Sequence, residues 1–276
     1  MNIEILLQSE EACRVAPLDA ELLLAHVLGV SRTQLLTWPL QPVSEAQTQV
    51  FQALLRRRAQ GEPFAYLVGT KEFWSLPLIV NADVLIPRPE TECLVEALLT
   101  RFPAEDPYAY QVLDLGTGSG AIALALAVER PHWQMIALDR SEAALNVAKQ
   151  NAHALSVDTI HWIASDWFSA LRSERCTVDI IVSNPPYIEK GDIHLQQDGL
   201  GYEPQAALVG GSDGLSDLHQ IICMAPAFLK PGGCLALEHG ATQGLAVRLL
   251  MKKQGFTREI TLKDLGGLDR LSLAYT

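Results

Sequence analysis

Residues 112–128 read VLDLGTGSGAIALALAV: a short apolar strand, a five-residue loop and an apolar helix. The loop is Gly116-Thr117-Gly118-Ser119-Gly120. Its glycines allow a tight turn and let a ligand approach the backbone at the positive end of the helix dipole. A strand, a glycine-rich loop and a helix in this order predict a cofactor site in an α/β fold.

Helices and strands alternate around this stretch. We expect helices at 91–101, 119–130, 141–154, 214–229 and 242–254, and strands at 110–115, 133–138, 159–164, 178–183, 234–238, 257–263 and 269–275. The turn Pro231-Gly232-Gly233 is expected to open the strand at 234–238. The order predicts a seven-stranded, Rossmann-like α/β sheet with helices on both faces, parallel except for an antiparallel hairpin at its end.

The first 90 residues have a different pattern. Apolar residues at helical spacing, with Ser31 and Ser44 placed as N-caps, predict a small helical-bundle domain over residues 1–60. Alternating apolar residues in FWSLPLIV predict a β-hairpin linker over 61–90. The α/β domain then occupies residues 91–276.

Charge limits the classes of partner. The 276 residues carry a formal net charge of −11. General nucleic-acid binding is therefore not expected, because it normally requires a basic face that neutralises phosphates. The basic run Arg56 to Arg58 is interpreted as a solvated helix end, with contact to RNA or an acidic partner as the alternative.

The cysteines and the hydropathy pattern limit the compartment. The five cysteines are Cys13, Cys93, Cys176, Cys223 and Cys234. They are scattered and form no CxxC pair, so neither a zinc ribbon nor a disulfide framework is expected, and no spacing predicts a metal site. We find no signal-peptide pattern and no apolar stretch of the ~18–20 residues that a membrane span needs. We therefore expect a soluble, reduced, cytoplasmic protein that does not bind membranes. We also expect it to be a monomer.

Acidic residues follow the next two strands. Asp139 ends MIALD, where it can accept both hydroxyls of an adenosine ribose. Asp166, in ASDWF, can accept from the adenine amino group while Trp167 covers the ring. A helix N-cap for Asp166 and a rim position for Trp167 are the alternatives. Because Ala121 completes a GxGxxA pattern, NAD competes with S-adenosylmethionine on these motifs.

The strand at 178–183 ends in Asn184-Pro185-Pro186-Tyr187, at the sheet edge where open α/β folds bind ligands. A planar amino group offers two hydrogens, and the Asn184 side-chain oxygen and the Pro185 carbonyl can each accept one. Tyr187 can pack against the flat group. The motif therefore predicts a site that aims a nitrogen at an electrophilic methyl group. A rigid proline turn is the alternative.

This tetrapeptide resembles that of the amino-methyltransferases, which methylate exocyclic nitrogens of adenine or amide nitrogens of glutamine. Within that group the chain is similar, over essentially its whole length, to the peptide-chain-release-factor glutamine methyltransferases, the PrmC/HemK family. The segments that carry the similarity are 86–92 (IPRPETE), 114–120, 165–168, 183–188, 202–204, 207–208, 238–240 and 264–270.

The resemblance implies a class I S-adenosylmethionine-dependent methyltransferase that acts on the glutamine of the Gly-Gly-Gln loop in class 1 release factors. By position, residues 116–120, Asp139, Trp167 and Asn184 would hold the methyl donor, whose product is S-adenosylhomocysteine. The NPPY residues would receive the glutamine amide, and the helical domain would recognise the release factor. IPRPETE would help to close the site, with Arg88 either contacting substrate or paired with Glu90 or Glu92.

Four other functions compete with this one. A ribosomal-protein glutamine methyltransferase shares NPPY and the cofactor loop, and resembles the chain less at PRPETE. An adenine methyltransferase of nucleic acids is disfavoured by the acidic charge and the lack of a basic cleft. The intact NPPY disfavours a nonenzymatic nucleotide-binding adaptor. The absence of a second catalytic constellation disfavours an NAD oxidoreductase.

Overall fold

The computed structural model describes residues 1–173, 177–196 and 199–276, so that Cys176 lies outside the described residues. The chain divides into two compact units. The first comprises residues 1–70 with 196–202, and the second comprises 71–195 with 203–276. The division at residue 70 lies within the segment predicted as a linker.

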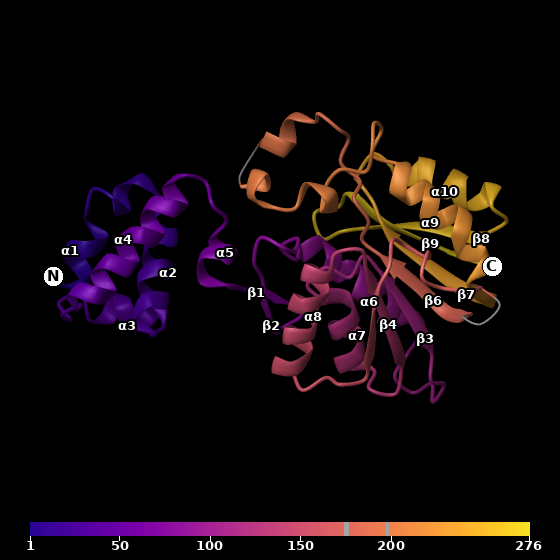
Figure 1. Ribbon diagram of the computed structural model, residues 1–276, viewed down its shortest axis with the longest axis horizontal. Helices are drawn as coiled ribbons and strands as arrows, with labels where there is room; N and C mark the ends of the chain where they lie inside the picture. Colours follow the sequence, from indigo (N-terminus) through magenta and orange to yellow (C-terminus); the bar gives the residue numbers. More distant parts are fainter. Residues whose placement is uncertain (174–176, 197–198) are drawn as a thin grey trace. The chain divides into compact units, whose positions relative to one another are not determined.

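The first unit is helical (Figure 1). Its elements are α1 (Ile3–Leu7), η1 (Ala12–Arg14), α2 (Pro17–Leu28), α3 (Arg32–Thr37), α4 (Glu45–Ala59), α5 (Phe64–Val68) and η4 (Leu200–Tyr202). Ser31 and Ser44 start α3 and α4 as N-caps, and Gln34 and Gln47 complete a capping box in each case. The predicted caps are therefore confirmed. The apolar faces of α2, α3 and α4 meet in a core that includes Leu23, Leu24, Leu35, Phe51 and Leu55.

The basic run lies at the C-terminal end of α4, where positive charge is favourable to the helix dipole. Arg57 forms an ion pair with Glu62, and Arg58 forms one with Asp19 at 2.7 Å. Two of the three arginines thus have acidic partners within the helical unit, as expected for a structural helix end.

The second unit is built on one seven-stranded sheet, as predicted. Its strands are β3 (Gln111–Leu115), β4 (Gln134–Asp139), β5 (Ile160–Ala164), β6 (Val178–Ser183), β7 (Leu229–Glu238), β8 (Thr257–Lys263) and β9 (Asp269–Tyr275). The strand order is β5-β4-β3-β6-β7-β9-β8. The first five strands of that order pair in parallel, whereas β9 is antiparallel to both β7 and β8.

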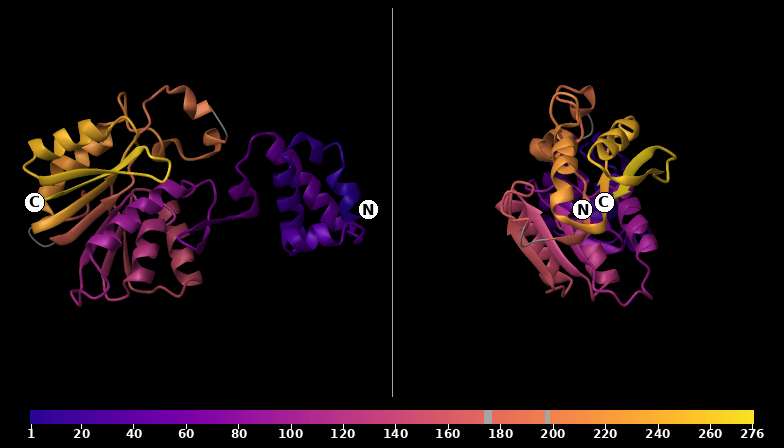
Figure 2. Two further views of the ribbon diagram at one scale, coloured as in Figure 1. Left: turned by 180° about the vertical axis from the view of Figure 1, so that it is seen from behind. Right: turned by 90° about the vertical axis from the view of Figure 1, so that its right-hand side faces the viewer.

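Helices cover both faces of this sheet (Figures 1 and 2). The helical elements that follow residue 80, apart from η4, are η2 (Pro89–Thr91), α6 (Glu92–Arg101), α7 (Ala121–Glu129), α8 (Glu142–Ala154), η3 (Ile193–Gln196), η5 (Gln205–Ala207), α9 (Ser216–Met224), η6 (Ala225–Ala227) and α10 (Gly244–Lys253). One apolar core forms between α6, α7 and the sheet, and the other forms between α9, α10 and the opposite face. The central strands β3 and β6 are buried on both faces, and most of their residues are therefore apolar.

A two-stranded hairpin, β1 (Thr70–Phe73) and β2 (Leu76–Ile79), precedes the sheet. Phe73 and Leu78 are buried in the core that contains α6 and α7. The buried side chain of Asn151 on α8 accepts from the amide of Ile79 at 2.6 Å and donates to its carbonyl at 3.0 Å. The hairpin is therefore fastened to the α/β unit as an extra piece of its surface.

Two predicted boundaries were wrong. The helix predicted to reach 229 ends at Met224 and continues as the 3₁₀ turn η6, because Pro226 has no amide hydrogen and disfavours helix at the preceding residue. The strand predicted to start at 234 starts at Leu229 instead. The PGG sequence forms an irregularity inside that strand, where the register with β6 shifts.

The topology positions a site. Strand β3 lies between β4 and β6, and these parallel strands end at the same edge of the sheet. The serine at the end of β6 ties two of the ends together, since Ser183 Oγ donates to the Leu115 carbonyl at 2.6 Å. Open α/β sheets bind ligands at such a switch point. Among the described residues, no helix combines the length and the apolarity needed to cross a membrane.

Candidate active site

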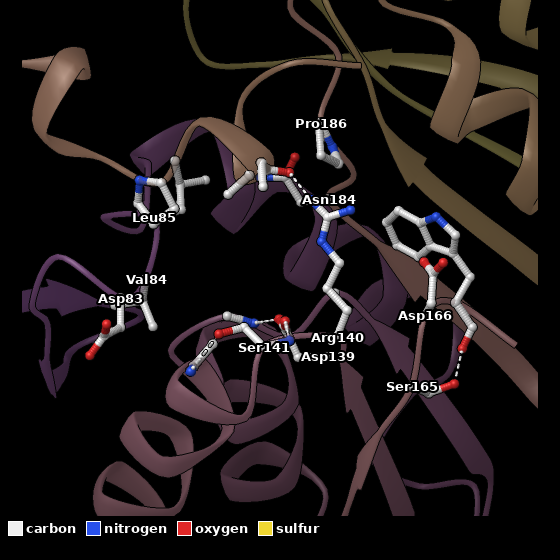
Figure 3. A pocket seen from close by; sticks show the side chains of 17 residues that line it. Asp83, Val84, Leu85, Asp139, Arg140, Ser141, Ser165, Asp166, Asn184 and Pro186 are labelled. Atoms are coloured by element: carbon white, nitrogen blue, oxygen red, sulfur yellow. Dashed lines mark hydrogen bonds between the residues drawn. The ribbon is translucent and has the colours of Figure 1, made fainter. Parts of the chain in front are cut away.

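A pocket of about 220 Å³ opens at this edge of the sheet. It is lined by residues of six segments: Asp83–Leu85, the glycine loop (Gly116, Gly118), the end of β4 and start of α8 (Asp139–Ser141, Ala144), Ser165–Trp167, Asn184 with Pro186, and Pro204 with Ala206 and Ala207. Figure 3 shows Asp139, Asp166 and Asn184 arriving from the ends of different strands. Seven of the predicted site residues are thus brought together around one cavity.

The glycine loop is held against the end of β4. The amides of Gly116 and Thr117 both donate to the Leu138 carbonyl at 2.8 Å. Gly118 has a φ of +57°, and a Cβ there would meet nothing within 4 Å. A left-handed glycine with open space beside it leaves the backbone accessible to a ligand.

The remaining three residues of the loop do not line the pocket. Thr117 is buried and donates from its hydroxyl to Asp114 at 2.6 Å. The carbonyl of Ser119 accepts from Asn151 at 2.9 Å. A Cβ on Gly120 would lie 3.0 Å from Leu124 and 3.2 Å from Ala148, so this glycine allows close helix packing. As cofactor contacts, Thr117, Ser119 and Gly120 stay predictions.

The carboxylate of Asp139 is held by two backbone donors. Its Oδ2 accepts from the amide of Gly118 at 2.9 Å, and its Oδ1 accepts from the amide of Ser141 at 2.9 Å. Each carboxylate oxygen has a second lone pair, so the group keeps the capacity to accept two hydroxyls from a ligand. Ser141 is also the N-cap of α8, which links the acid to the start of that helix.

Asp166 and Trp167 form the opposite wall. Trp167 has a φ of +46°, which costs energy for a residue with a Cβ. Its indole lies against Gly116, where a Cβ would stand 3.3 Å from the ring. The indole nitrogen donates to Asp217 of α9 at 3.2 Å. No helix follows Asp166, since the chain makes a turn there, so its alternative role as an N-cap is wrong.

The NPPY residues divide into two groups. Asn184 and Pro186 line the pocket, whereas Pro185 and Tyr187 lie behind it. Asn184 Nδ2 donates to Thr91 Oγ1 at 3.1 Å. Because the amide is planar, this bond directs the side-chain oxygen to the side away from Thr91. The tyrosine hydroxyl donates to Oε1 of Glu238 at 3.1 Å.

Glu238, at the end of β7, is 1% exposed. Burial is the main cause that raises the pKa of its carboxyl to about 7, and it also raises the pKa of Tyr187. The positive charge of Arg270 on β9 lowers both pKa values. Its own guanidinium is paired with Asp264 at 3.0 Å. A titratable pair therefore lies directly behind the NPPY backbone.

That backbone is packed against two glycines that sequence reasoning did not identify. A Cβ on Gly210 would lie 2.4 Å from the Pro186 carbonyl oxygen, and one on Gly214 would lie 2.3 Å from that of Tyr187. Gln243 donates to the Tyr187 carbonyl at 3.0 Å. Only glycine fits at these two positions, and the run VGGSDG was the signal that could have indicated a close backbone approach.

Two contacts between distant parts of the sequence support the pocket. Glu203 is 4% exposed and accepts from the amide of Ile86 at 3.0 Å and from Arg88 at 2.5 Å. Arg88 thus pairs with Glu203, so the predicted pairing with Glu90 or Glu92 was wrong. Arg140 extends from the end of β4 across the pocket and donates to the Ala206 carbonyl at 3.0 Å (Figure 3). The IPRPETE segment and residues 203–207 are therefore tied to each other and to the sheet.

The residues present fit a cofactor that contains a nucleoside and a charged tail. The pocket offers the carboxylate of Asp139, held in place, to a diol. It also offers the flat indole of Trp167 and the open backbone of Gly118. Beneath it, Asp114 is fully buried, and among the described residues its Oδ1 has no hydrogen-bond partner. Burial raises the pKa of Asp114 to about 7. No group of three or more metal-ligating side chains occurs in the described ranges.

Comparisons with known proteins show which family the chain resembles. The model of the PrmC N-terminal domain matches residues 6–69, and that of the methyltransferase small domain matches residues 90–198. The release factor glutamine methyltransferase of Salmonella typhimurium is 47% identical over 254 residues, which are 92% of this chain and 90% of the relative. That of Escherichia coli K12 is 49% identical over 255 residues, 92% and 90% of the two chains.

Solved structures share the fold at low identity. The catalytic domain of hMettl16, in complex with an RNA hairpin, superposes with a TM-score of 0.58 at 16% identity, covering 84% of this chain and 82% of that one. The Thermus thermophilus 16S rRNA methyltransferase RsmC, in complex with AdoMet and guanosine, gives a TM-score of 0.55 at 23% identity, covering 75% and 49%. These likenesses confirm the class I methyltransferase fold.

Proposed function

The chain belongs to the family of release factor glutamine methyltransferases, and we propose that it methylates the glutamine of the Gly-Gly-Gln motif in class 1 peptide chain release factors. The methyl group would come from S-adenosyl-L-methionine and be attached to the side-chain amide nitrogen, with S-adenosyl-L-homocysteine as the second product. The observation that carries the proposal is the hydrogen bond from Asn184 Nδ2 to Thr91. It directs the asparagine oxygen away from Thr91, so that this oxygen is available to accept from an incoming amide.

The cofactor is assigned to the pocket by its chemistry. Asp139 would accept the two ribose hydroxyls, Trp167 would cover the adenine, and Asp166 would accept from its amino group. Residues 116–120 would contact the methionine part of the cofactor, and Asn184 would lie beside the sulfonium. When bound, S-adenosylmethionine supplies a methyl group that is already activated for transfer. The protein therefore has to provide position more than chemical activation.

The reacting amide needs both orientation and electron density. Its nitrogen is a poor nucleophile because the lone pair is delocalised into the carbonyl. The Asn184 oxygen and the Pro185 carbonyl would each accept one hydrogen of the glutamine –NH2, aiming the nitrogen in line at about 3 Å from the methyl carbon. Two acceptors on these hydrogens also stabilise the positive charge that develops on nitrogen during transfer. Tyr187 would hold the backbone of this clamp through Glu238.

The rest of the chain is assigned by the same proposal. Residues 1–60 would recognise the release factor, and residues 91–276 would catalyse the methyl transfer. Residues 61–90 would connect these two domains. We propose that the protein acts as a monomer in the cytoplasm, without general affinity for nucleic acid. The formal net charge of −11 would suit a protein substrate better than a phosphate backbone.

A transfer assay with a labelled methyl donor distinguishes the substrate classes. The purified chain is incubated in parallel with a class 1 release factor, with ribosomal proteins and with double-stranded DNA. Label on the release factor alone is expected. Label on a ribosomal protein would keep the amide chemistry and change the target, and label on DNA alone would contradict the proposal.

A further inference from the structure

We propose that Glu238 is a positioning residue that, through the hydroxyl of Thr91, sets which end of the Asn184 amide faces the substrate. The inference rests on the proposed function, since the amide being oriented is the one assigned to the glutamine clamp. Glu238 lies on β7 and Thr91 in η2, and neither residue lines the pocket.

Asn184 and Thr91 share a hydrogen bond, and Thr91 in turn acts on the buried carboxyl of Glu238. Asn184 Nδ2 donates to Thr91 Oγ1 at 3.1 Å, and Thr91 is 4% exposed. A hydroxyl that accepts at its oxygen must direct its single hydrogen elsewhere. The nearby Glu238 carboxyl interacts with that hydroxyl, which lowers the pKa of the acid by side-chain hydrogen bonding. Among the described residues Oε2 of this buried carboxyl has no hydrogen-bond partner, so it is free to receive the Thr91 hydrogen.

The direction of these bonds depends on the charge of Glu238. An ionised carboxylate accepts only, so Thr91 donates to it and its oxygen accepts from the nitrogen of Asn184. The asparagine oxygen then faces the pocket, where it can accept from the glutamine –NH2. A protonated Glu238 can donate to Thr91 instead. Thr91 would then donate to the asparagine oxygen, and the Asn184 –NH2 would face the –NH2 of the substrate without an acceptor.

Several charged or titratable groups surround the acid. Tyr187 donates to Oε1 from the loop after β6, and Arg270 of β9 favours the ionised form. Glu90 of η2 opposes it, and Cys93 of α6 also lies within electrostatic range. The balance of burial against these partners leaves the pKa of Glu238 at about 7, so the orientation of Asn184 is set by a group that titrates near neutrality.

The test compares two substitutions of nearly equal size at Thr91. Thr91→Ser keeps the hydroxyl, and Thr91→Val removes it from a side chain of the same shape. With a class 1 release factor as substrate, T91V is expected to lower kcat by about 10- to 100-fold, the usual effect of losing a group that orients an active-site ligand. T91S is expected to keep most of the kcat of the unmodified chain. The dissociation constant for S-adenosylmethionine is expected to be unchanged in both variants.

A pH profile adds a readout that a merely structural role would not move. In the unmodified chain kcat is expected to rise as the pH increases through about 7, because ionised Glu238 orients Asn184 productively. Glu238→Gln is expected to lower kcat and to remove this rise. Thermal unfolding of each variant checks that the fold is kept. If E238Q fails to fold, the comparison of T91V with T91S still tests the proposal.

The outcomes separate this inference from the function on which it rests. If the unmodified chain methylates the release factor and T91V matches T91S in kcat, the positioning role is refuted while the function stands. A loss in T91V that appears only in the affinity for the cofactor also refutes it. If the unmodified chain does not methylate the release factor at all, both proposals fail.

Discussion

The amide of Gly118 donates a hydrogen bond of 2.9 Å to Oδ2 of Asp139, so the glycine loop after β3 and the acid that ends β4 form one unit. The loop presents backbone without a side chain, and the acid presents a carboxylate held by Gly118 on one oxygen and Ser141 on the other. A ligand with a diol next to a charged tail would meet both features at once. Two substitutions test the parts of this unit separately.

Replacing Asp139 with alanine removes the proposed ribose acceptor. The affinity for S-adenosylmethionine is expected to fall by about 10- to 100-fold, since hydrogen bonds to a charged acceptor contribute ~1.5–3 kcal/mol each. Isothermal titration calorimetry measures this change. An affinity within twofold of the unmodified chain would show that the ribose binds elsewhere.

Gly118→Ala tests the open space in the loop. The substitution strains a φ of +57° and places a methyl group in the cavity, so we expect at least tenfold weaker binding of the cofactor. Gly29→Ala is the matched control, because Gly29 has a φ of +66° and equally open surroundings in the helical unit. Both variants should lose about 1–2 kcal/mol of stability, and only G118A should lose cofactor affinity. Equal affinities in the two variants would contradict the role of the loop.

The orientation of Trp167 depends on Asp217. Because the indole nitrogen donates to this carboxyl, Asp217→Ala should free the ring and weaken cofactor binding by a few-fold, less than the about tenfold expected for Trp167→Ala. Equilibrium binding of the cofactor to both variants gives the comparison. If D217A weakened binding more than W167A did, the acid would have to contact the cofactor itself.

Burial of Asp114 predicts a pH dependence of stability. Its pKa is about 7 in the folded protein and near 3.8 when unfolded, so the folded state binds the proton more tightly. The free energy of unfolding should therefore fall as the pH rises from about 4 to about 7, by at most ~1.4 kcal/mol per unit for this group. Asp114→Asn should lessen that fall in urea unfolding measured at several pH values. Parallel curves for the two proteins would contradict the assignment.

The elements around the cofactor pocket could be predicted because their signals are local. The run from Val112 to Val128 contains a strand, a glycine turn and a helix within one short stretch, and acids at strand ends are visible in sequence. The seven strands and both seryl caps were predicted for the same reason. The two boundaries that were wrong lie at Pro226 and at the PGG irregularity, where backbone sterics override the hydrophobic pattern.

The contacts that support the site could not be predicted in this way. Glu203 is 115 residues from Arg88, and Asp217 is 50 residues from Trp167, so no spacing rule connects them. The need for glycine at 210 and 214 comes from carbonyls of the NPPY segment, which only the folded chain brings near. Sequence therefore identified the groups that line the pocket better than the groups behind them.

Asn184→Ala tests the clamp by removing one of its two proposed acceptors. The variant is expected to fold and to bind S-adenosylmethionine, yet to lose about 10²-fold or more in methyl transfer, as when one orienting polar contact in an active site is removed. Single-turnover transfer to a release factor, measured beside cofactor binding, checks both halves. Near-normal transfer by this variant would refute the amide clamp.

The most direct test of the central claim is tandem mass spectrometry of a class 1 release factor after incubation with this protein and S-adenosylmethionine. The predicted result is one added methyl group on the side chain of the Gly-Gly-Gln glutamine, absent when Asn184→Ala replaces the unmodified chain. A methyl group on any other residue of the release factor, or none on that glutamine, would contradict the account.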